Sequence, residues 1–203
     1  MDDQFWSWKY LSNSKPTWIS HFHQVDECLK TNPDSILEIG VGTGLFGSVI
    51  KHFTNVVYES LDITPELKPT YIASVLNLPF SDNSFDTICC FQVLEHLPFE
   101  DFETALRQIF RCAKNAVVLS LPNAGRVIKI KLPKIKFNIE LFGLRQNIYS
   151  GHMWEINYKG SPKKIVEKKI YNIVPVGWEL KKSYRVDENP YHHFYVFSKI
   201  KSE

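Results

Sequence analysis

The sequence predicts an α/β fold: a doubly wound sheet, mostly parallel, with a C-terminal antiparallel hairpin strand and helices on both faces. Short apolar runs typical of buried strands alternate with stretches whose apolar residues recur at helical spacing, and this alternation indicates a parallel sheet covered by helices. The chain ends in two strand-like segments separated by Asp-Glu-Asn-Pro, which predicts a closing hairpin. A length of 203 residues suits one large domain.

Each expected element is bounded by residues that stop helices or form turns. The first helix ends before Pro33 and is followed by an apolar strand, which runs straight into a glycine-rich segment and a second helix. The turn-rich stretch Pro-Phe-Ser-Asp-Asn precedes the third strand, and an amphipathic helix separates that strand from the fourth. In chain order we expect helix 18–32, strand 35–39, helix 44–53, strands 55–62 and 84–94, helix 99–114, strand 115–123, helix 161–174, and strands 177–186 and 191–200.

The composition is that of an ordinary globular protein, with 44% apolar and 23% charged residues and no low-complexity tract, which argues against disorder. The four cysteines lack the C-x-x-C spacing of redox or zinc sites, so we expect reduced, structural thiols and no metal site. The start of the chain has neither a basic leader nor a long apolar stretch. We therefore expect no signal peptide, no membrane span and a cytoplasmic location.

Charge is distributed unevenly along the chain. Residues 1–125 hold 8 Lys and Arg against 15 Asp and Glu, a balance of −7, whereas residues 126–182 hold 13 against 4, a balance of +9. Within this basic segment, residues 127–137 alternate apolar and basic side chains around Pro133. The pattern fits a β-hairpin arm, a membrane-surface contact or a nucleic-acid clamp, and a solvated lid edge is the default interpretation.

The stretch SILEIGVGTG, residues 35–44, places three glycines at alternate positions directly after the first strand. A strand that runs into a glycine loop and a helix N-terminus is typical of a site for a nucleotide-like ligand, because bare backbone allows close approach and unpaired N–H groups face the ligand. The dinucleotide pattern G-x-G-x-x-G fails, since Leu45 stands where the third glycine is needed. No Gly-Lys-Ser or Gly-Lys-Thr follows, so a triphosphate is disfavoured.

The segment EIGVGTG, together with SVLNLPFSDNSFDTICCFQVLEHL further on, resembles the class I S-adenosylmethionine-dependent methyltransferase family, and in particular its small-molecule, type 11-like domains. The resemblance implies a Rossmann-like fold with S-adenosyl-L-methionine as cofactor. The resemblance covers residues 34–123 by motif position and 145–198 more loosely. We expect residues 1–203 to form a single methyltransferase domain with four parts: an N-terminal helical cap at 1–33, a cofactor-binding core at 34–123, a basic lid or insertion at 124–160, and a C-terminal helix with closing strands at 161–203.

The resemblance also implies roles for individual residues at the cofactor. In the family, the glycine loop and the acidic residue before it hold the methionine end, an acidic residue that closes the second strand binds the ribose hydroxyls, and the fourth strand ends at the sulfonium side. A serine stands where the adenine loop usually has a carboxylate. The implied cofactor-binding residues are Glu38, Gly40, Gly42 and Gly44 in the glycine loop, Asp62 at the ribose, Ser74, Val75 and Leu76 at the adenine, and Gln92 and Val93 at the sulfonium.

Methyl transfer from a sulfonium is an in-line displacement, so positioning and water exclusion supply much of the catalysis and no catalytic residue is strictly required. A hydroxyl or protonated amine acceptor benefits from a general base, and His or Glu near the methyl group is the expected type. The substrate-side candidates are His96, just beyond the fourth strand, and His152 and Glu155 in the segment GHMWE. A structural role is an equal alternative for each of the three.

These expectations combine into a methyltransferase that acts on a small-molecule acceptor, which is anionic if the basic segment faces it. Two alternatives stay open: a non-catalytic S-adenosylmethionine-binding adaptor, and an RNA methyltransferase that uses residues 126–182. The chain lacks the Asn/Asp-Pro-Pro-Tyr/Phe motif of amino methyltransferases that act on DNA adenine or protein glutamine. The sequence predicts neither the acceptor atom nor the oligomeric state.

Overall fold

The computed structural model describes residues 14–132, 135–141 and 151–200. Parts of the expected N-terminal cap and of the basic segment therefore lie outside the described residues. The described chain forms a seven-stranded sheet in the order β3-β2-β1-β4-β5-β9-β8 and a separate two-stranded sheet, β6-β7. The strands are β1 (Ser35–Ile39), β2 (Val57–Asp62), β3 (Tyr71–Ile72), β4 (Phe85–Phe91), β5 (Ala113–Pro122), β6 (Arg126–Leu132), β7 (Ile135–Leu141), β8 (Trp178–Arg185) and β9 (His192–Lys199).

The large sheet confirms the predicted architecture. β1 pairs in parallel with β2 and β4, β2 with β3, and β4 with β5, whereas β9 runs antiparallel to both β5 and β8. β8 and β9 form the predicted C-terminal hairpin. Because the strand order reverses between β1 and β4, the carboxyl ends of these two strands flank the place where open α/β sheets bind their ligands.

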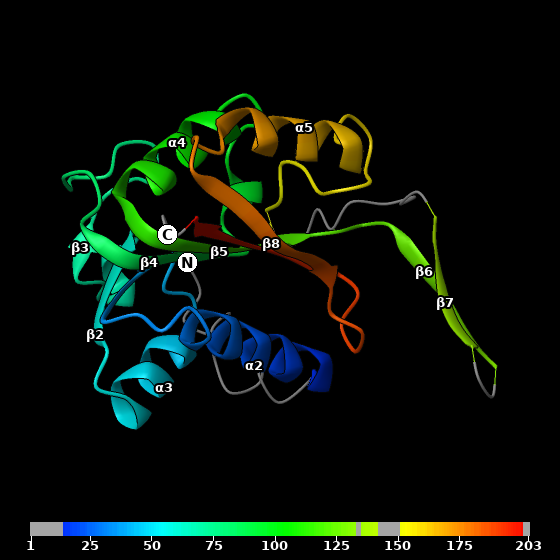
Figure 1. Cartoon of the computed structure of the whole chain (residues 1–203), viewed down its shortest axis with the longest axis horizontal. Coiled ribbons are helices and arrows are strands. Elements are labelled where there is room, and N and C mark those ends of the chain that lie inside the picture. Colours follow the sequence, from blue (N-terminus) through cyan, green and yellow to red (C-terminus); the bar gives the residue numbers. More distant parts are fainter. Residues whose placement is uncertain (1–13, 133–134, 142–150, 201–203) are drawn as a thin grey trace.

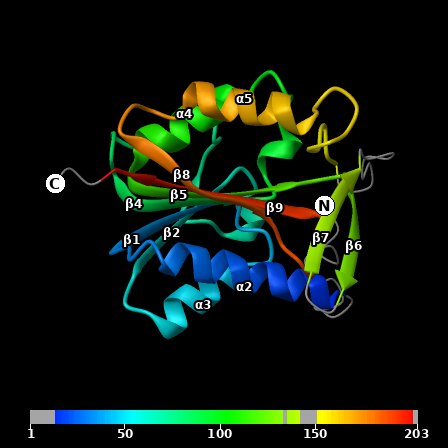
Figure 2. The same ribbon diagram turned by 45° about the vertical axis from the view of Figure 1, so that its right-hand side comes forward.

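Helices cover both faces of the large sheet. Figure 1 shows α2 and α3 on one face and α4 and α5 on the other, and the turned view in Figure 2 agrees. Two hydrophobic clusters fill the layers, one between the sheet and α4 with α5, the other between the sheet and α2 with α3. The helices are α2 (Lys15–Leu29), α3 (Leu45–Phe53), α4 (Phe102–Cys112) and α5 (Lys163–Ile173), and two short 3-10 helices are η1 (Pro65–Leu67) and η2 (Leu94–His96).

Several elements differ from the sequence expectation, and among them α4 begins at Phe102 rather than at 99. α2 begins earlier, at Lys15, because the Ser14 hydroxyl caps it by accepting the Thr17 N–H at 3.3 Å and a proline occupies the first turn. β4 ends at Phe91, and η2 replaces the last part of the expected strand. β3 was not expected, because a strand of two residues carries no periodic pattern.

The basic segment contains a two-stranded β-hairpin. β6 and β7 pair antiparallel from Arg126↔Leu141 to Leu132↔Ile135, and the hairpin extends away from the body of the molecule in Figure 1. The backbone therefore confirms the hairpin among the interpretations of residues 127–137. Within the described part of the chain, no helix has the length and apolar character needed to cross a membrane.

Candidate active site

The glycine loop joins β1 to α3. Gly40, Gly42 and Gly44 have φ values of 85°, 51° and 70°, in the left-handed region that residues with a Cβ rarely adopt. Gly44 is the N-cap of α3, so the first backbone N–H groups of that helix border the loop. The Gly40 N–H donates to the Leu61 carbonyl oxygen at 2.8 Å, which ties the loop to the end of β2.

Gly40 and Gly44 differ in their surroundings. A Cβ added at Gly40 would lie 2.2 Å from Val93 Cγ2, so the missing side chain lets Val93 pack directly against the loop. A Cβ added at Gly44 would meet no atom of the described residues within 4 Å. The loop is therefore closed on the side of Val93 and open at Gly44, where a ligand can approach the backbone.

Asp62 ends β2 beside the glycine loop. Its Oδ2 atom accepts the Val41 N–H at 2.9 Å, and its Oδ1 atom accepts the Thr64 N–H at 2.9 Å. Each carboxylate oxygen has a second lone pair, so the carboxylate can accept hydroxyl groups while it holds the loop in place. Sequence reasoning missed the contact to Val41, because that contact depends on β1 and β2 being neighbours.

Glu38, on β1, is buried at 3% exposed, and the Tyr58 hydroxyl on β2 donates a hydrogen bond to its Oε2 atom. Burial raises the pKa of Glu38 to about 8, although the hydrogen bond from Tyr58 opposes the rise. Glu38 therefore holds its proton at neutral pH. Sequence reasoning missed Tyr58, which fits only because Gly47 has no side chain: a Cβ there would lie 2.5 Å from the Tyr58 ring.

Ser74, Val75 and Leu76, the predicted adenine-loop residues, follow β3. The Ser74 Oγ atom accepts the Leu76 N–H at 3.2 Å, so the hydroxyl shapes a local turn. Val75 is buried, and the half-buried Leu76 packs against the same hydrophobic cluster. The segment thus presents a hydroxyl where the family usually has a carboxylate, next to two apolar side chains.

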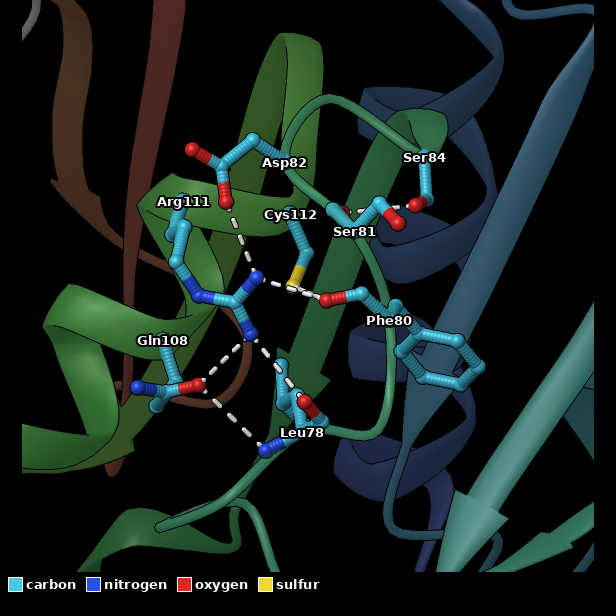
Figure 3. A network of polar contacts seen from close by, with 8 residues as sticks. All are labelled: Leu78, Phe80, Ser81, Asp82, Ser84, Gln108, Arg111 and Cys112. Carbon is cyan, nitrogen blue, oxygen red and sulfur yellow. Dashed lines mark hydrogen bonds and ion pairs between the residues drawn. The ribbon is translucent and has the colours of Figure 1, made fainter.

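Arg111 of α4 holds the backbone that follows this segment (Figure 3). Its guanidinium donates to the carbonyl oxygens of Phe80 and Leu78 at 2.6 and 3.0 Å. It also donates to Asp82 Oδ1 at 3.0 Å and to Gln108 Oε1 at 2.8 Å. Because one side chain fastens two loop carbonyls to α4, Arg111 stabilises the loop without being part of the local motif.

Gln92 and Val93 directly follow β4. Gln92 has a φ of 54°, an uncommon conformation for a residue with a Cβ and one that is concentrated at functional sites. Its Nε2 atom donates to Ser120 Oγ on β5 at 3.2 Å. Since Val93 packs against Gly40, the end of β4 lies beside the glycine loop.

The structure brings the three substrate-side candidates, His96, His152 and Glu155, together. The ring centroids of His96 and His152 are 5.0 Å apart, and His152 Nδ1 lies 2.8 Å from Glu155 Oε1. Tyr191, which sequence reasoning missed, donates its hydroxyl to Glu155 Oε1 at 2.7 Å. The cluster thus joins three segments of the chain: the one after β4, the one after the hairpin and the one before β9.

His96 is the most exposed member of this cluster. Its Nδ1 atom lies 3.2 Å from the Gly151 carbonyl oxygen. Because a carbonyl only accepts, Nδ1 carries the hydrogen and Nε2 is the basic nitrogen. Partial burial lowers the pKa of His96, against the effect of this hydrogen bond. The ring is therefore neutral at neutral pH, as a general base must be.

Comparisons with known proteins agree with this geometry. A family model described as a methyltransferase domain matches residues 37–121. An uncharacterized protein of Methanocaldococcus jannaschii is 30% identical over 170 residues, which cover 74% of this chain and 72% of that protein.

Two solved structures illustrate the likeness of the fold. The magnesium protoporphyrin IX methyltransferase of Synechocystis PCC 6803, with bound S-adenosylmethionine, has a TM-score of 0.56 at 13% identity over 91% of this chain and 80% of that one. The small RNA methyltransferase HEN1 has a TM-score of 0.59 at 14% identity over 95% of this chain and 26% of that one. At these identities the likeness shows the fold.

The sheet is doubly wound, and an open glycine loop and a carboxylate lie where its strand order reverses. This arrangement is typical of proteins that bind a nucleoside cofactor. The chain belongs to the class I S-adenosylmethionine-dependent methyltransferase family. The family's cofactor is S-adenosyl-L-methionine. The residues here fit that cofactor, because Gly44 leaves the loop open and Asp62 keeps lone pairs for hydroxyl groups.

Proposed function

We propose that this protein transfers a methyl group from S-adenosylmethionine to a small-molecule acceptor. The observation that carries the proposal is the open backbone at Gly44 beside the Asp62 carboxylate, where the strand order reverses. Backbone N–H groups and a carboxylate with remaining lone pairs suit a nucleoside that bears an amino-acid tail. The methyltransferase-domain match over residues 37–121 supports the reaction class.

The cofactor contacts follow from the order of these residues around the sheet. The Asp62 carboxylate accepts the ribose hydroxyls, and this role is compatible with its hydrogen bonds to Val41 and Thr64. Ser74 replaces a carboxylate with a hydroxyl, so the adenine amine meets a weaker acceptor. The other proposed contacts are Glu38, Gly40, Gly42 and Gly44 at the methionine end, Val75 and Leu76 at the adenine ring, and Gln92 and Val93 at the sulfonium.

When bound, S-adenosylmethionine supplies a methyl group that its sulfonium activates. The protein's own contribution is to hold the acceptor in line, exclude water and, for a hydroxyl or ammonium acceptor, remove a proton. His96 Nε2 is the proposed proton acceptor, because the ring is accessible and its Nδ1 is held by Gly151. The His152–Glu155 pair, with side chains 6% and 0% exposed, fixes the wall beside that ring.

Ion pairs within the protein favour a small-molecule acceptor over RNA, because they involve cations of the basic segment. Lys169 pairs with Glu103 at 2.9 Å, and Lys182 pairs with Glu27 at 2.7 Å. These two cations bind the acidic body of the protein, which leaves less charge for a nucleic-acid backbone. The likeness to HEN1 keeps RNA as the second candidate, and a non-catalytic adaptor is the third.

Methyl-labelled S-adenosylmethionine tests the proposal. The purified chain is incubated with cell extract split into a small-molecule filtrate, RNA and protein, and we expect label in the filtrate. His96→Ala should slow the transfer by about 10² or more if Nε2 removes the proton. His52→Ala, at an exposed position on α3, is the matched control and should transfer at the native rate.

The other outcomes separate the alternatives. Label in RNA alone, with transfer that falls steeply as salt rises, would establish the RNA methyltransferase. Cofactor binding with no transfer into any of the three fractions would support the adaptor and contradict the enzyme.

A further inference from the structure

Two of the substrate-side candidates, His96 and His152, lie beside the buried carboxyl of Glu95. Glu95, His96 and His152 each offer one ligand atom, and the three atoms all lie within 4.8 Å of one another. Glu95 and His96 belong to η2, directly after β4, whereas His152 lies far along the chain, after the hairpin. These residues contradict the expectation of no metal site, which rested on the spacing of the cysteines and did not consider ligands from distant segments.

Glu95 is the unusual member of this group. Its side chain is 0% exposed, and neither carboxylate oxygen has a hydrogen-bond partner among the described residues. A buried carboxylate without a partner is costly, so it is found paired with a cation or protonated.

Each of the two imidazoles has one nitrogen within hydrogen-bond distance of an oxygen. His152 Nδ1 lies 2.8 Å from Glu155 Oε1, and Tyr191 donates to the same oxygen. His152 Nε2 points to Glu95 Oε1 at 3.8 Å. His96 Nδ1 donates to the Gly151 carbonyl oxygen. Metal-binding histidines characteristically have their second nitrogen held by a carboxylate or a backbone carbonyl in this way.

The distance between His152 Nε2 and Glu95 Oε1 also fits a shared ion. At 3.8 Å it is too long for a hydrogen bond. Two ligand atoms each about 2.1 Å from a tetrahedral ion lie roughly 3.4 Å apart, so a small inward movement of either side chain would let both reach one ion.

We propose that Glu95, His96 and His152 form a binding site for a divalent transition-metal ion. One carboxylate and two imidazoles favour Zn²⁺ and its first-row neighbours over Mg²⁺, which prefers oxygen ligands. Three protein ligands leave coordination positions for water or for an oxygen of a bound molecule. The exposure of His96 gives the ion a way in.

The position of the site ties it to the acceptor. Gln92 and Val93, the proposed sulfonium neighbours, precede Glu95 by one short turn of chain. If an ion is bound here, His96 would serve as its ligand instead of as the proton acceptor. The ion would then lower the pKa of an acceptor hydroxyl and so assist the loss of its proton. This consequence rests on the proposed function, whereas the binding site itself does not.

Equilibrium dialysis of the metal-stripped full chain against Zn²⁺, without S-adenosylmethionine, tests the site. We expect one Zn²⁺ per chain, retained in excess Mg²⁺. His96→Gln and Glu95→Gln should each weaken Zn²⁺ binding at least tenfold. His52→Gln, at an exposed histidine outside the cluster, should bind as the native chain does. Far-UV circular dichroism checks folding, and His96→Gln keeps the test decisive if the buried Glu95→Gln variant unfolds.

Two results would overturn the site. One is a native chain that binds less than one Zn²⁺, or binds it no more tightly than His96→Gln. The other is a Co²⁺-loaded chain whose spectrum shows thiolate charge transfer, since this would place the ion at the cysteines. Because the measurement uses no cofactor, failure here leaves the methyltransferase proposal untouched, and failure of methyl transfer leaves the metal site untouched.

Discussion

Gly40 and Gly44 adopt left-handed backbone in the same loop for different physical reasons. Gly40 admits Val93, and a side chain there would collide with it. Gly44 borders open space, so a side chain there would strain the backbone and project toward an incoming ligand. We therefore expect a substitution at Gly40 to affect folding and one at Gly44 to affect ligand binding as well.

The first prediction uses Gly44 with a matched glycine elsewhere. Gly177, before the edge strand β8, has a φ of 84°, and a Cβ there would also meet no atom of the described residues within 4 Å. Gly44→Ala and Gly177→Ala should each cost about 1–2 kcal/mol of stability, because alanine must adopt the left-handed region. Only Gly44→Ala should also weaken S-adenosylmethionine binding, by roughly tenfold or more. Urea unfolding and calorimetry measure the two effects, and equal affinities in both variants would remove Gly44 from the site.

The second prediction concerns Glu38 and pH. Its ordinary pKa is 4.5 and its folded value is about 8, so between these values the folded chain holds a proton that the unfolded chain releases. The contribution of Glu38 to stability therefore falls as pH rises from about 5 to 8, by on the order of 1.4 kcal/mol per pH unit. Glu38→Gln removes this titration, so its stability relative to the native chain should increase with pH.

Urea unfolding of both chains at several pH values measures the effect. The control is Glu66→Gln, which alters an exposed carboxylate and should follow the native profile. If the Glu38→Gln and native curves stay parallel from pH 5 to 8, Glu38 is already ionised in the folded chain.

At the residue scale, the sequence predicted the residues that belong to a local motif and missed those whose contacts form only in the folded chain. The three loop glycines and Asp62 were predicted as site residues because each lies at or just after the end of a strand. Tyr58, Glu95 and Tyr191 were missed, because their contacts join segments that only the folded sheet makes neighbours. Burial, which gives Glu38 and Glu95 their raised pKa values, is likewise a property of the fold.

At the scale of elements, the clearest consequence comes from the hydrogen bonds that join α4 to the backbone following the predicted adenine residues. Arg111→Lys keeps the charge but loses the planar fork that reaches the Phe80 and Leu78 carbonyl oxygens together. We expect a loss of about 1–3 kcal/mol in stability and weaker binding of the adenosine half of the cofactor.

The control for this third prediction lies on the same helix. Arg107 is exposed, so Arg107→Lys should behave as the native chain in thermal unfolding and in titration with adenosine. Native-like results for Arg111→Lys would show that the loop holds its shape without the guanidinium.

Elements were predictable where their apolar pattern was long. The strands β1, β4 and β5 lie on continuous runs of buried residues, and the buried residues of α4 recur at helical spacing. β3 has two residues and no pattern, and η2 follows an apolar run that reads as continued strand. The start of α2 depends on a capping hydroxyl rather than on periodicity.

At the scale of the whole molecule, the acidic and basic parts of the chain attract one another. The pairs Lys169–Glu103 and Lys182–Glu27 join α5 to α4 and β8 to α2. Some of the basic residues that cause the charge asymmetry therefore form ion pairs within the protein. The basic β6-β7 hairpin, by contrast, extends away from the body of the molecule (Figure 1). The fold class and strand directions were predictable, whereas these pairings required the folded chain.

The most direct test of the account is calorimetric titration of the full chain with S-adenosylmethionine. We predict that the native chain binds one equivalent and that Asp62→Asn binds it about 1–3 kcal/mol more weakly, because the ribose loses charge-assisted hydrogen bonds. Asp26→Asn breaks the helical ion pair to Lys30 and should bind as the native chain does. A native chain that gives no binding heat at any temperature, or an Asp62→Asn curve that superimposes on the native one, would contradict the claim that this loop and carboxylate hold the cofactor.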